Sequence, residues 1–110
     1  MVTTRYNVIL HSLLGPRNGT INFVSKGDKL NGVFTILNYA TCFSGGRLNG
    51  DQFEFSSEIK TSFINLQCTV KGTFNRNNLT AVVETNKGNM IITGTKVEAE
   101  NEAELNDCIN

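Results

Sequence analysis

The residues with the clearest capacity for chemistry are one histidine and three cysteines. The alternation of apolar residues that turns Leu10 inward turns His11 outward, which predicts an exposed side chain. No carboxylate or thiol partner lies near His11 in the sequence, so a role as general base is not favoured. Cys68 shares its face with apolar neighbours, which favours a small buried hydrophobe over a reactive thiolate. Cys42, Cys68 and Cys108 are odd in number and widely spaced, which predicts free thiols and neither a disulfide framework nor a metal pair.

Glutamates are the next candidates, because paired carboxylates can act as acid and base. Glu54 and Glu58 lie on the polar side of the stretch GDQFEFSSEIKT, residues 50–61, with Lys60 beside them, so we expect solvated surface charges. The expected interior offers hydroxyls, one thiol and Tyr6 rather than a buried ionisable cluster. We therefore predict that the protein is not an enzyme and has no catalytic residue, no metal site and no cofactor.

Length, charge and hydropathy bound the class of protein. A chain of 110 residues forms one domain. Ten basic and ten acidic residues leave a net charge of zero, so nothing favours a nucleic-acid partner. Residues 1–15 alternate and lack a small-residue cleavage site, and no apolar run reaches the roughly 18–20 residues of a membrane span. These features predict a cytoplasmic protein without a membrane span.

Turn-forming residues recur about every dozen residues between stretches rich in β-branched and aromatic residues. The spacing predicts eight strands, at residues 5–14, 20–26, 29–37, 40–48, 52–61, 63–74, 79–86 and 89–97. Short connections favour an all-β, eight-stranded antiparallel up-and-down barrel, since closure removes the exposed edges of an open sheet. The alternative is a two-sheet sandwich, which usually needs a longer crossover connection. The barrel would occupy residues 1–97 and an acidic tail residues 98–110, where a short C-terminal helix is an open alternative.

Alternation places one face of every strand inside this barrel. The candidate ligand-binding residues are the inward apolar ones, Tyr6, Phe23, Phe34, Phe53, Phe55, Leu66 and Val83. Small inward residues at Gly32, Ala81 and Gly94 keep room for a pocket. A packed core is the competing interpretation, because each buried aromatic side chain stabilises a small domain by about 1.5–3 kcal/mol.

The stretch TCFSGGRL has an ambiguous alternation, because it puts Phe43 and Leu48 on opposite faces. A bulge at its two glycines would reset the register. Phe43 would then face the interior and Cys42 the outside.

Several strands end in a short polar side chain just before a turn. Ser12, Thr61 and Thr85 follow two places after an inward apolar residue, and Asn38 ends a further strand. Strands that run in the same direction gather these groups at one end of the barrel, where they would orient the polar part of an apolar guest. The competing interpretation is that they bond to turn backbone and end the strands.

The glycine and threonine repeats resemble a known group of proteins. The stretches LGPRNGTI, LNGVFTIL, FSGG, FEFSSEIKT and GTFNRNNLTAVVETNKGNMIITGT are similar to those of small, mostly uncharacterised bacterial barrels of calycin (lipocalin-like) type, over residues 5–96. The resemblance implies the barrel, and by analogy with lipocalins and avidins it implies ligand binding. A related-looking bacterial regulator binds a protein through its outer surface, but its acidic surface motif does not occur in the barrel region here.

Two functions follow as expectations. The first is the binding of a small hydrophobic ligand inside the barrel. The second is a protein-interaction or regulatory module, with a homodimer or another protein as partner, and it predicts an exposed apolar patch. Its outward candidates are Val24, Val33, Leu37, Phe63, Val82 and Ile91. The tail has four open interpretations: a frayed end, a lid, a partner-binding helix, or an intermolecular disulfide through Cys108.

Overall fold

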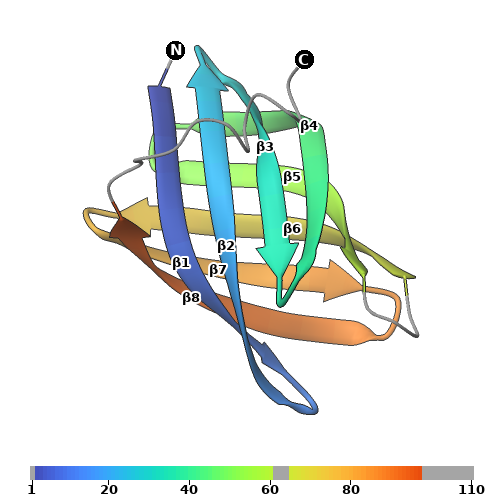
Figure 1. Cartoon of the computed structure of the whole chain (residues 1–110). Coiled ribbons are helices and arrows are strands. Elements are labelled where there is room, and N and C mark those ends of the chain that lie inside the picture. The colour runs from blue at the N-terminus through green and yellow to red at the C-terminus, as the bar shows by residue number, and fades with distance from the viewer. Residues whose placement is uncertain (1, 61–64, 98–110) are drawn as a thin grey trace.

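The strands form a closed antiparallel barrel in the computed structural model, which describes residues 2–60 and 65–97 (Figure 1). The strand order is β1 (Val2–Ser12), β2 (Gly15–Lys26), β3 (Lys29–Ile36), β4 (Tyr39–Asn49), β5 (Gln52–Lys60), β6 (Asn65–Asn75), β7 (Asn78–Thr85) and β8 (Gly88–Val97). Each strand pairs with the next one in the chain, and β8 pairs with β1. The predicted up-and-down barrel of eight strands is confirmed.

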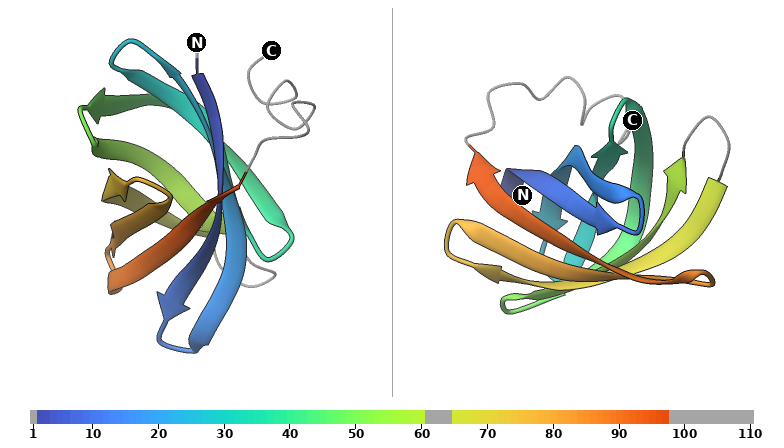
Figure 2. Two further views of the ribbon diagram at one scale, coloured as in Figure 1. Left: turned by 90° about the vertical axis from the view of Figure 1, so that its left-hand side faces the viewer. Right: turned by 90° about the horizontal axis from the view of Figure 1, so that it is seen from below.

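The seam between β1 and β8 closes the barrel. Its register runs from Arg5 opposite Val97 to His11 opposite Ile91. Closure satisfies the backbone groups that an open sheet would leave at its two edges. Figure 2 shows the strands wrapped around a common interior from two further directions. No helix in the described part of the chain is long and apolar enough to cross a membrane.

Alternation decides which side chains enter the interior. In β5, Phe53, Phe55, Ser57 and Ile59 are buried, whereas Gln52, Glu54 and Ser56 between them are exposed. A strand has a side-chain period of two, so one buried face per strand is the expected result for a barrel with a dry inside. The predicted Leu66 is only partly buried, and it packs against the same core cluster.

The predicted bulge in β4 is present. Leu30 pairs with Gly46 and Gly32 pairs with Phe43, so β4 has one more residue than β3 over this stretch. Gly45 adopts a φ of 73°, a left-handed conformation that suits glycine, and its backbone N–H donates to Asn31 Oδ1 at 3.2 Å. The bulge turns Phe43 into the interior and leaves Cys42 on the outer face, as predicted.

The two ends of the barrel differ in their turns. We call the end with the β1–β2, β3–β4 and β7–β8 turns the hydroxyl end, and the end where β1 begins and β8 finishes the terminal end. The β1–β2 hairpin extends beyond the other turns (Figure 1). Within residues 2–60 and 65–97, two turn residues other than glycine have positive φ, Leu37 at 56° and Arg76 at 54°.

Predictions for two segments lie outside the described residues. Thr61 and Phe63 fall in the connection between β5 and β6, and the acidic tail begins after Val97. The division into a barrel and a tail, and the open alternative of a C-terminal helix, therefore stay predictions.

Candidate functional site: an aromatic core and a pocket at the terminal end

The predicted interior residues form one cluster. Tyr6, Phe23, Phe34, Phe53, Phe55 and Val83 are all buried in it, together with Phe43, which the bulge turns inward. Phe23 is its central ring: five aromatic rings surround it in edge-to-face arrangements, with centroids between 5.2 Å (Phe53) and 6.0 Å (Phe43 and Phe55) away. These rings fill the middle of the barrel.

The small inward residues do not leave a hollow there. A side chain at Gly32 would meet Phe43 Cζ at 2.9 Å, and one at Gly94 would meet Val8 Cγ1 at 2.8 Å. Neighbouring side chains already fill the space that each glycine leaves. The stacked rings of Phe43 and Phe55, with centroids 3.9 Å apart, also occupy the interior. Among the described residues, the middle of the barrel is thus a packed core, as the competing interpretation predicted.

A pocket opens at the terminal end. Its volume is about 230 Å³, and it is lined by Thr4, Tyr6, Phe23, Ser25, Leu30, Leu48, Gly50, Phe74 and Lys96. These residues come from the beginning of β1, the ends of β2, β4, β6 and β8, the start of β3 and the β4–β5 turn. The Tyr6 ring stacks on Phe74, with centroids 5.5 Å apart, so the wall is aromatic. The pocket includes two of the predicted ligand-binding residues, Tyr6 and Phe23.

Lys96 is the charged residue of the lining, and the sequence analysis did not predict it as part of a site. It pairs with Tyr6 across the β1–β8 seam and so shares the inward side. A lysine can hold its ammonium group at the barrel end while its methylenes contact apolar residues below. The alternation of residues along β8 indicates that Lys96 faces inward. Only the pairing of β8 with β1 shows that Lys96 lies beside Tyr6.

Tyr6 is a neutral group at this pocket. Burial raises the pKa of its phenol above the ordinary value. The phenol therefore keeps its proton well above neutral pH and can donate a hydrogen bond. The pocket combines an apolar wall with a neutral hydroxyl and a cation.

The predicted mouth hydroxyls bond to turn backbone. Ser12 Oγ donates to the Gly15 carbonyl at 2.6 Å, and Thr85 Oγ1 donates to the Gly88 carbonyl at 2.7 Å. Thr85 Oγ1 also accepts the Lys87 backbone N–H at 3.0 Å. These contacts match the competing interpretation, in which the hydroxyls end the strands. They lie at the hydroxyl end, opposite the pocket.

The fourth mouth residue, Asn38, contributes to the outside of the barrel. It lines a shallow depression with residues of the outer surface, among them Asn18, Thr35 and Leu37. The structure thus does not bring Ser12, Thr85 and Asn38 together with the pocket that Tyr6 and Phe23 line.

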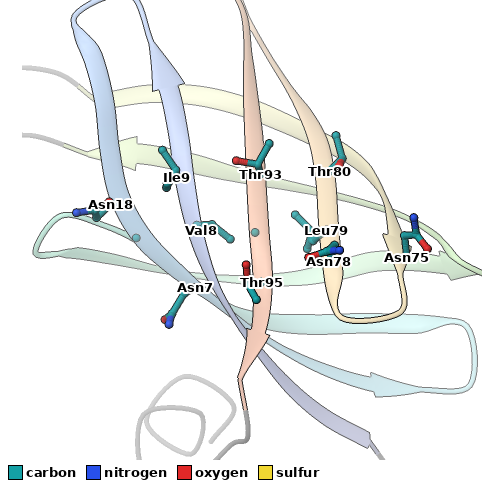
Figure 3. A pocket seen from close by; sticks show the side chains of 12 residues that line it. Asn7, Val8, Ile9, Asn18, Asn75, Asn78, Leu79, Thr80, Thr93 and Thr95 are labelled. Atoms are coloured by element: carbon teal, nitrogen blue, oxygen red, sulfur yellow. The ribbon is translucent and has the colours of Figure 1, made fainter.

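A larger depression, of about 760 Å³, lies on the outer face of the barrel (Figure 3). Its lining includes the apolar Val8, Ile9 and Leu79 and seven amide or hydroxyl side chains: Asn7, Asn18, Asn75, Asn78, Thr80, Thr93 and Thr95. It is uncharged and wide open to solvent. His11 lies next to it, on the outer face as predicted, with Nε2 3.0 Å from Thr93 Oγ1. The cross-strand register assembles this surface from five strands, so the linear sequence gave no signal for it.

Ionisable side chains on the outer face form ordinary ion pairs. Lys71 Nζ lies 3.1 Å from Glu84 and 3.7 Å from Glu54. The hydrogen bond that Lys71 donates to the Glu84 carboxylate is the main reason that the pKa of Lys71 is raised. All three side chains are about half exposed, so the pairs stabilise the fold only weakly. Within residues 2–60 and 65–97, no group of three or more histidine, cysteine or acidic side chains is arranged to hold a metal ion.

The two described cysteines differ in chemical state. Cys68 is a buried free thiol, and burial is the main reason that its pKa is raised to about 11, which disfavours the reactive thiolate at neutral pH. Cys42 on the outer face is disulfide-bonded. The prediction of free thiols is therefore confirmed for Cys68 and wrong for Cys42, since cysteine spacing in the sequence says little about which thiols meet in space.

No protein-family model matches the chain, and neither a curated protein nor a solved structure matches it.

Proposed function

We propose that the protein binds a small, mainly apolar molecule carrying an anionic group, in the pocket at the terminal end. The observation that carries this proposal is the composition of the pocket: an aromatic and aliphatic wall around Tyr6, Phe23 and Phe74, with Lys96 among the lining residues. Ligand sites are typically apolar with a few polar groups that fix orientation. The ammonium group would face an anionic head while the wall covers the apolar body.

The size of the pocket limits the ligand. Its volume of about 230 Å³ lies below the roughly 300–1,000 Å³ of pockets for drug-sized molecules. A short-chain or medium-chain carboxylate, or a single-ring aromatic acid, suits this volume better than a long lipid. The proposal moves the site from the middle of the barrel, where Phe34, Phe55 and Val83 are packed, to its terminal end.

The calycin-like resemblance adds an analogy to the proposal, because the mouths of β-barrels are frequent ligand sites. The predicted cytoplasmic location also stays a proposal, and the disulfide at Cys42 weighs against it, since disulfides are rare in a reducing cytosol.

Titration with octanoate tests the proposal, with binding followed by calorimetry and by amide shifts in NMR spectra. We expect shifts at Leu48 and Phe74, and a Kd about five-fold higher for Lys96→Gln, equivalent to a loss of about 1 kcal/mol. Lys87→Gln, in the β7–β8 turn at the other end of the barrel, is the matched control and should bind as the parent does. Equal weakening by both variants, or no shifts at the pocket, would contradict the proposal.

A second candidate function, a protein-interaction module, is favoured by the tip of the β1–β2 hairpin. Leu13 is 96% exposed and Leu14 is 84% exposed. Turns of this kind usually carry polar residues, so two exposed leucines on a projecting hairpin form a small apolar surface for a partner or a second copy. Native mass spectrometry of the parent and of Leu13→Ser/Leu14→Ser tests this function. A dimer or complex should be lost in the variant, and an unchanged assembly state would contradict it.

A further inference from the structure

The described turns at the two ends of the barrel differ in polarity. Those at the terminal end contain only glycine and polar residues: Gly27–Asp28, Gly50–Asp51 and Arg76–Asn77. Those at the hydroxyl end contain three leucines and no acidic residue: Leu13–Leu14, Leu37–Asn38 and Asn86–Lys87. Turns usually carry polar residues, so the leucines indicate a surface that serves contact rather than folding.

The exposed apolar surface lies at these leucine-containing turns. Leu13 and Leu14 are almost fully exposed, and Leu37 is 50% exposed. The outward candidates Val24 and Val33 are only 6% and 2% exposed and form a buried cluster of their own. The exposed apolar patch predicted at these two valines is therefore wrong, whereas the exposure predicted for Leu37 is confirmed.

Leu13 and Leu14 lie at the tip of the part of the β1–β2 hairpin that projects. Leu10 is the last core residue of β1 before the turn. Three residues of strand, at about 3.3 Å each, place Leu13 about 10 Å further along the hairpin. The hairpin extends beyond the other described turns (Figure 1, and the left view of Figure 2). The apolar tip is therefore convex and stands clear of the barrel.

The turn holds the two leucines in this position. Ser12 pairs with Gly15 across the ladder, so only Leu13 and Leu14 lie between the two strands. The hydrogen bond from Ser12 Oγ to the Gly15 carbonyl oxygen, at 2.6 Å, closes the turn further. The leucines are therefore presented to the surroundings by a short turn with little freedom to fold back onto the barrel.

A cation lies directly beside the apolar tip. Arg17 Nη1 donates to the Pro16 carbonyl oxygen at 3.3 Å, and it would lie 3.9 Å from a Cβ atom placed on Gly15. None of the ion pairs in the described part of the chain involves Arg17. Lys87 in the β7–β8 turn and Lys60 at the end of β5 add positive charge at the same end of the barrel.

The shape and charge of the tip match a lipid surface better than a protein. A stable protein interface covers about 800 Å² on each partner, and two leucines on a convex tip offer far less. A membrane interface accepts apolar side chains to a depth of about 5–10 Å, and anionic headgroups above them attract arginine and lysine. The hairpin has the same order, with leucines at the tip and Arg17 behind them.

We propose that the β1–β2 hairpin docks the protein on an anionic membrane surface, with Leu13 and Leu14 inserted in the interface and Arg17 at the lipid phosphates. The pocket at the terminal end then faces away from the membrane and stays open to solvent. This role goes beyond the proposed ligand binding. It assigns to lipid the tip that the second candidate function assigns to a protein.

Sedimentation with vesicles tests the proposal. One set of vesicles is phosphatidylcholine alone, and the other contains equal amounts of phosphatidylcholine and phosphatidylglycerol. We expect the parent to bind the anionic vesicles, and to bind them less as the salt concentration rises. Leu13→Ser/Leu14→Ser should lower the vesicle affinity at least about ten-fold, because two apolar side chains no longer enter the interface.

A matched pair of arginine variants tests the orientation. Arg17→Gln should lower the affinity for the anionic vesicles about five-fold, since one cation near such a surface contributes about that much. Arg76→Gln removes the same charge from a turn at the terminal end and should bind as the parent does. Equal weakening by the two variants would contradict the docked hairpin, because only the overall charge would then matter.

Two further outcomes would overturn the proposal. The first is a parent that does not bind the anionic vesicles, and the second is binding that the Leu13→Ser/Leu14→Ser variant retains. A complex that native mass spectrometry detects in the parent and not in this variant, without vesicle binding, would assign the tip to a protein. The octanoate titration reports on the terminal-end pocket separately, so failure of either proposal leaves the other open to its own test.

Discussion

Cys68 shows how burial changes the chemistry of one residue. Its thiol lies inside the barrel, opposite Ser57 of β5, and burial outweighs the backbone hydrogen bond with Ser57, which acts in the other direction on the pKa. The same thiol in an unfolded chain is in water. The two states therefore bind protons differently at alkaline pH, and the folded state must lose stability there.

We expect the free energy of unfolding to fall as pH rises from about 9 towards 11, the interval between the ordinary pKa of a cysteine, 9.0, and the raised pKa of Cys68. Below pH 9 both states keep the proton and the contribution is constant. The loss should reach about 2 kcal/mol. Urea unfolding at several pH values measures it, and Cys68→Ala should remove most of this slope; a slope unchanged in the variant would assign it to other groups.

Residue types and alternation were enough to predict which side chains face inward. The aromatic cluster around Phe23 and the inward turn of Phe43 follow from a period of two and one bulge. Alternation predicts which face of a strand a side chain lies on, but not how exposed to solvent it is. It therefore predicted that Val24 and Val33 face outward, but not that they are buried. Whether Cys42 forms a disulfide depends on which cysteines lie close together in space, and a single sequence does not contain that information.

The turns show what single elements contribute. In the β1–β2 and β7–β8 turns, Ser12 and Thr85 each bond to the glycine that pairs with them, so two distant hairpins use the same device. The β6–β7 turn differs, because Arg76 has a φ of 54°. A residue with a Cβ atom resists this conformation, and no packing gain at this exposed side chain offsets the strain.

Arg76→Gly should raise the free energy of unfolding by about 0.5–1 kcal/mol, because glycine adopts positive φ without a steric cost. The control is Lys87→Gly in the β7–β8 turn, where the lysine has no positive φ and the same change should be neutral or destabilising. Chemical unfolding of both variants measures the difference. A loss of stability in Arg76→Gly would show that the arginine side chain makes a contact that matters more than the backbone.

Element boundaries were largely predictable. Turn residues located the connections between the later strands, but not the one between β1 and β2. That turn is Leu13–Leu14, which the prediction had placed inside the first strand, and β1 and β2 form a longer hairpin than expected. The prediction started β2 at Thr20 because Pro16 and Gly19 read as turn residues. The paired registers show that both residues lie within the β1–β2 ladder, where the long hairpin accommodates them.

Closure is the property of the whole molecule on which the pocket depends. The β1–β8 seam brings Lys96 beside Tyr6, and Gly94 beside Val8. At Gly94 the barrel wall is tight, since any side chain there would meet Val8 Cγ1 at 2.8 Å and the Asn7 carbonyl oxygen at 3.1 Å. The candidate pocket thus exists only because the first and last strands meet in this register.

Gly94→Val should lower the free energy of unfolding by about 1–3 kcal/mol, because the added methyl groups push β8 away from β1. The control is Thr95→Val, which changes the neighbouring outward residue and should be nearly neutral. Urea unfolding gives the stabilities, and hydrogen exchange at β1 amides reports the seam. An unchanged free energy of unfolding in Gly94→Val would mean that β8 can shift relative to β1 without a loss of stability.

The stacking of Tyr6 on Phe74 gives this molecule a built-in optical reporter. The sequence has two tyrosines and no tryptophan, and the second tyrosine, Tyr39, lies at the start of β4 at the hydroxyl end. When the exciting light has a wavelength longer than the phenylalanine absorption band, the fluorescence of the protein comes from these two phenols. In a Tyr39→Phe protein all of the tyrosine fluorescence would come from Tyr6 in the wall of the pocket. Ligand binding could then be followed by fluorescence without any added label.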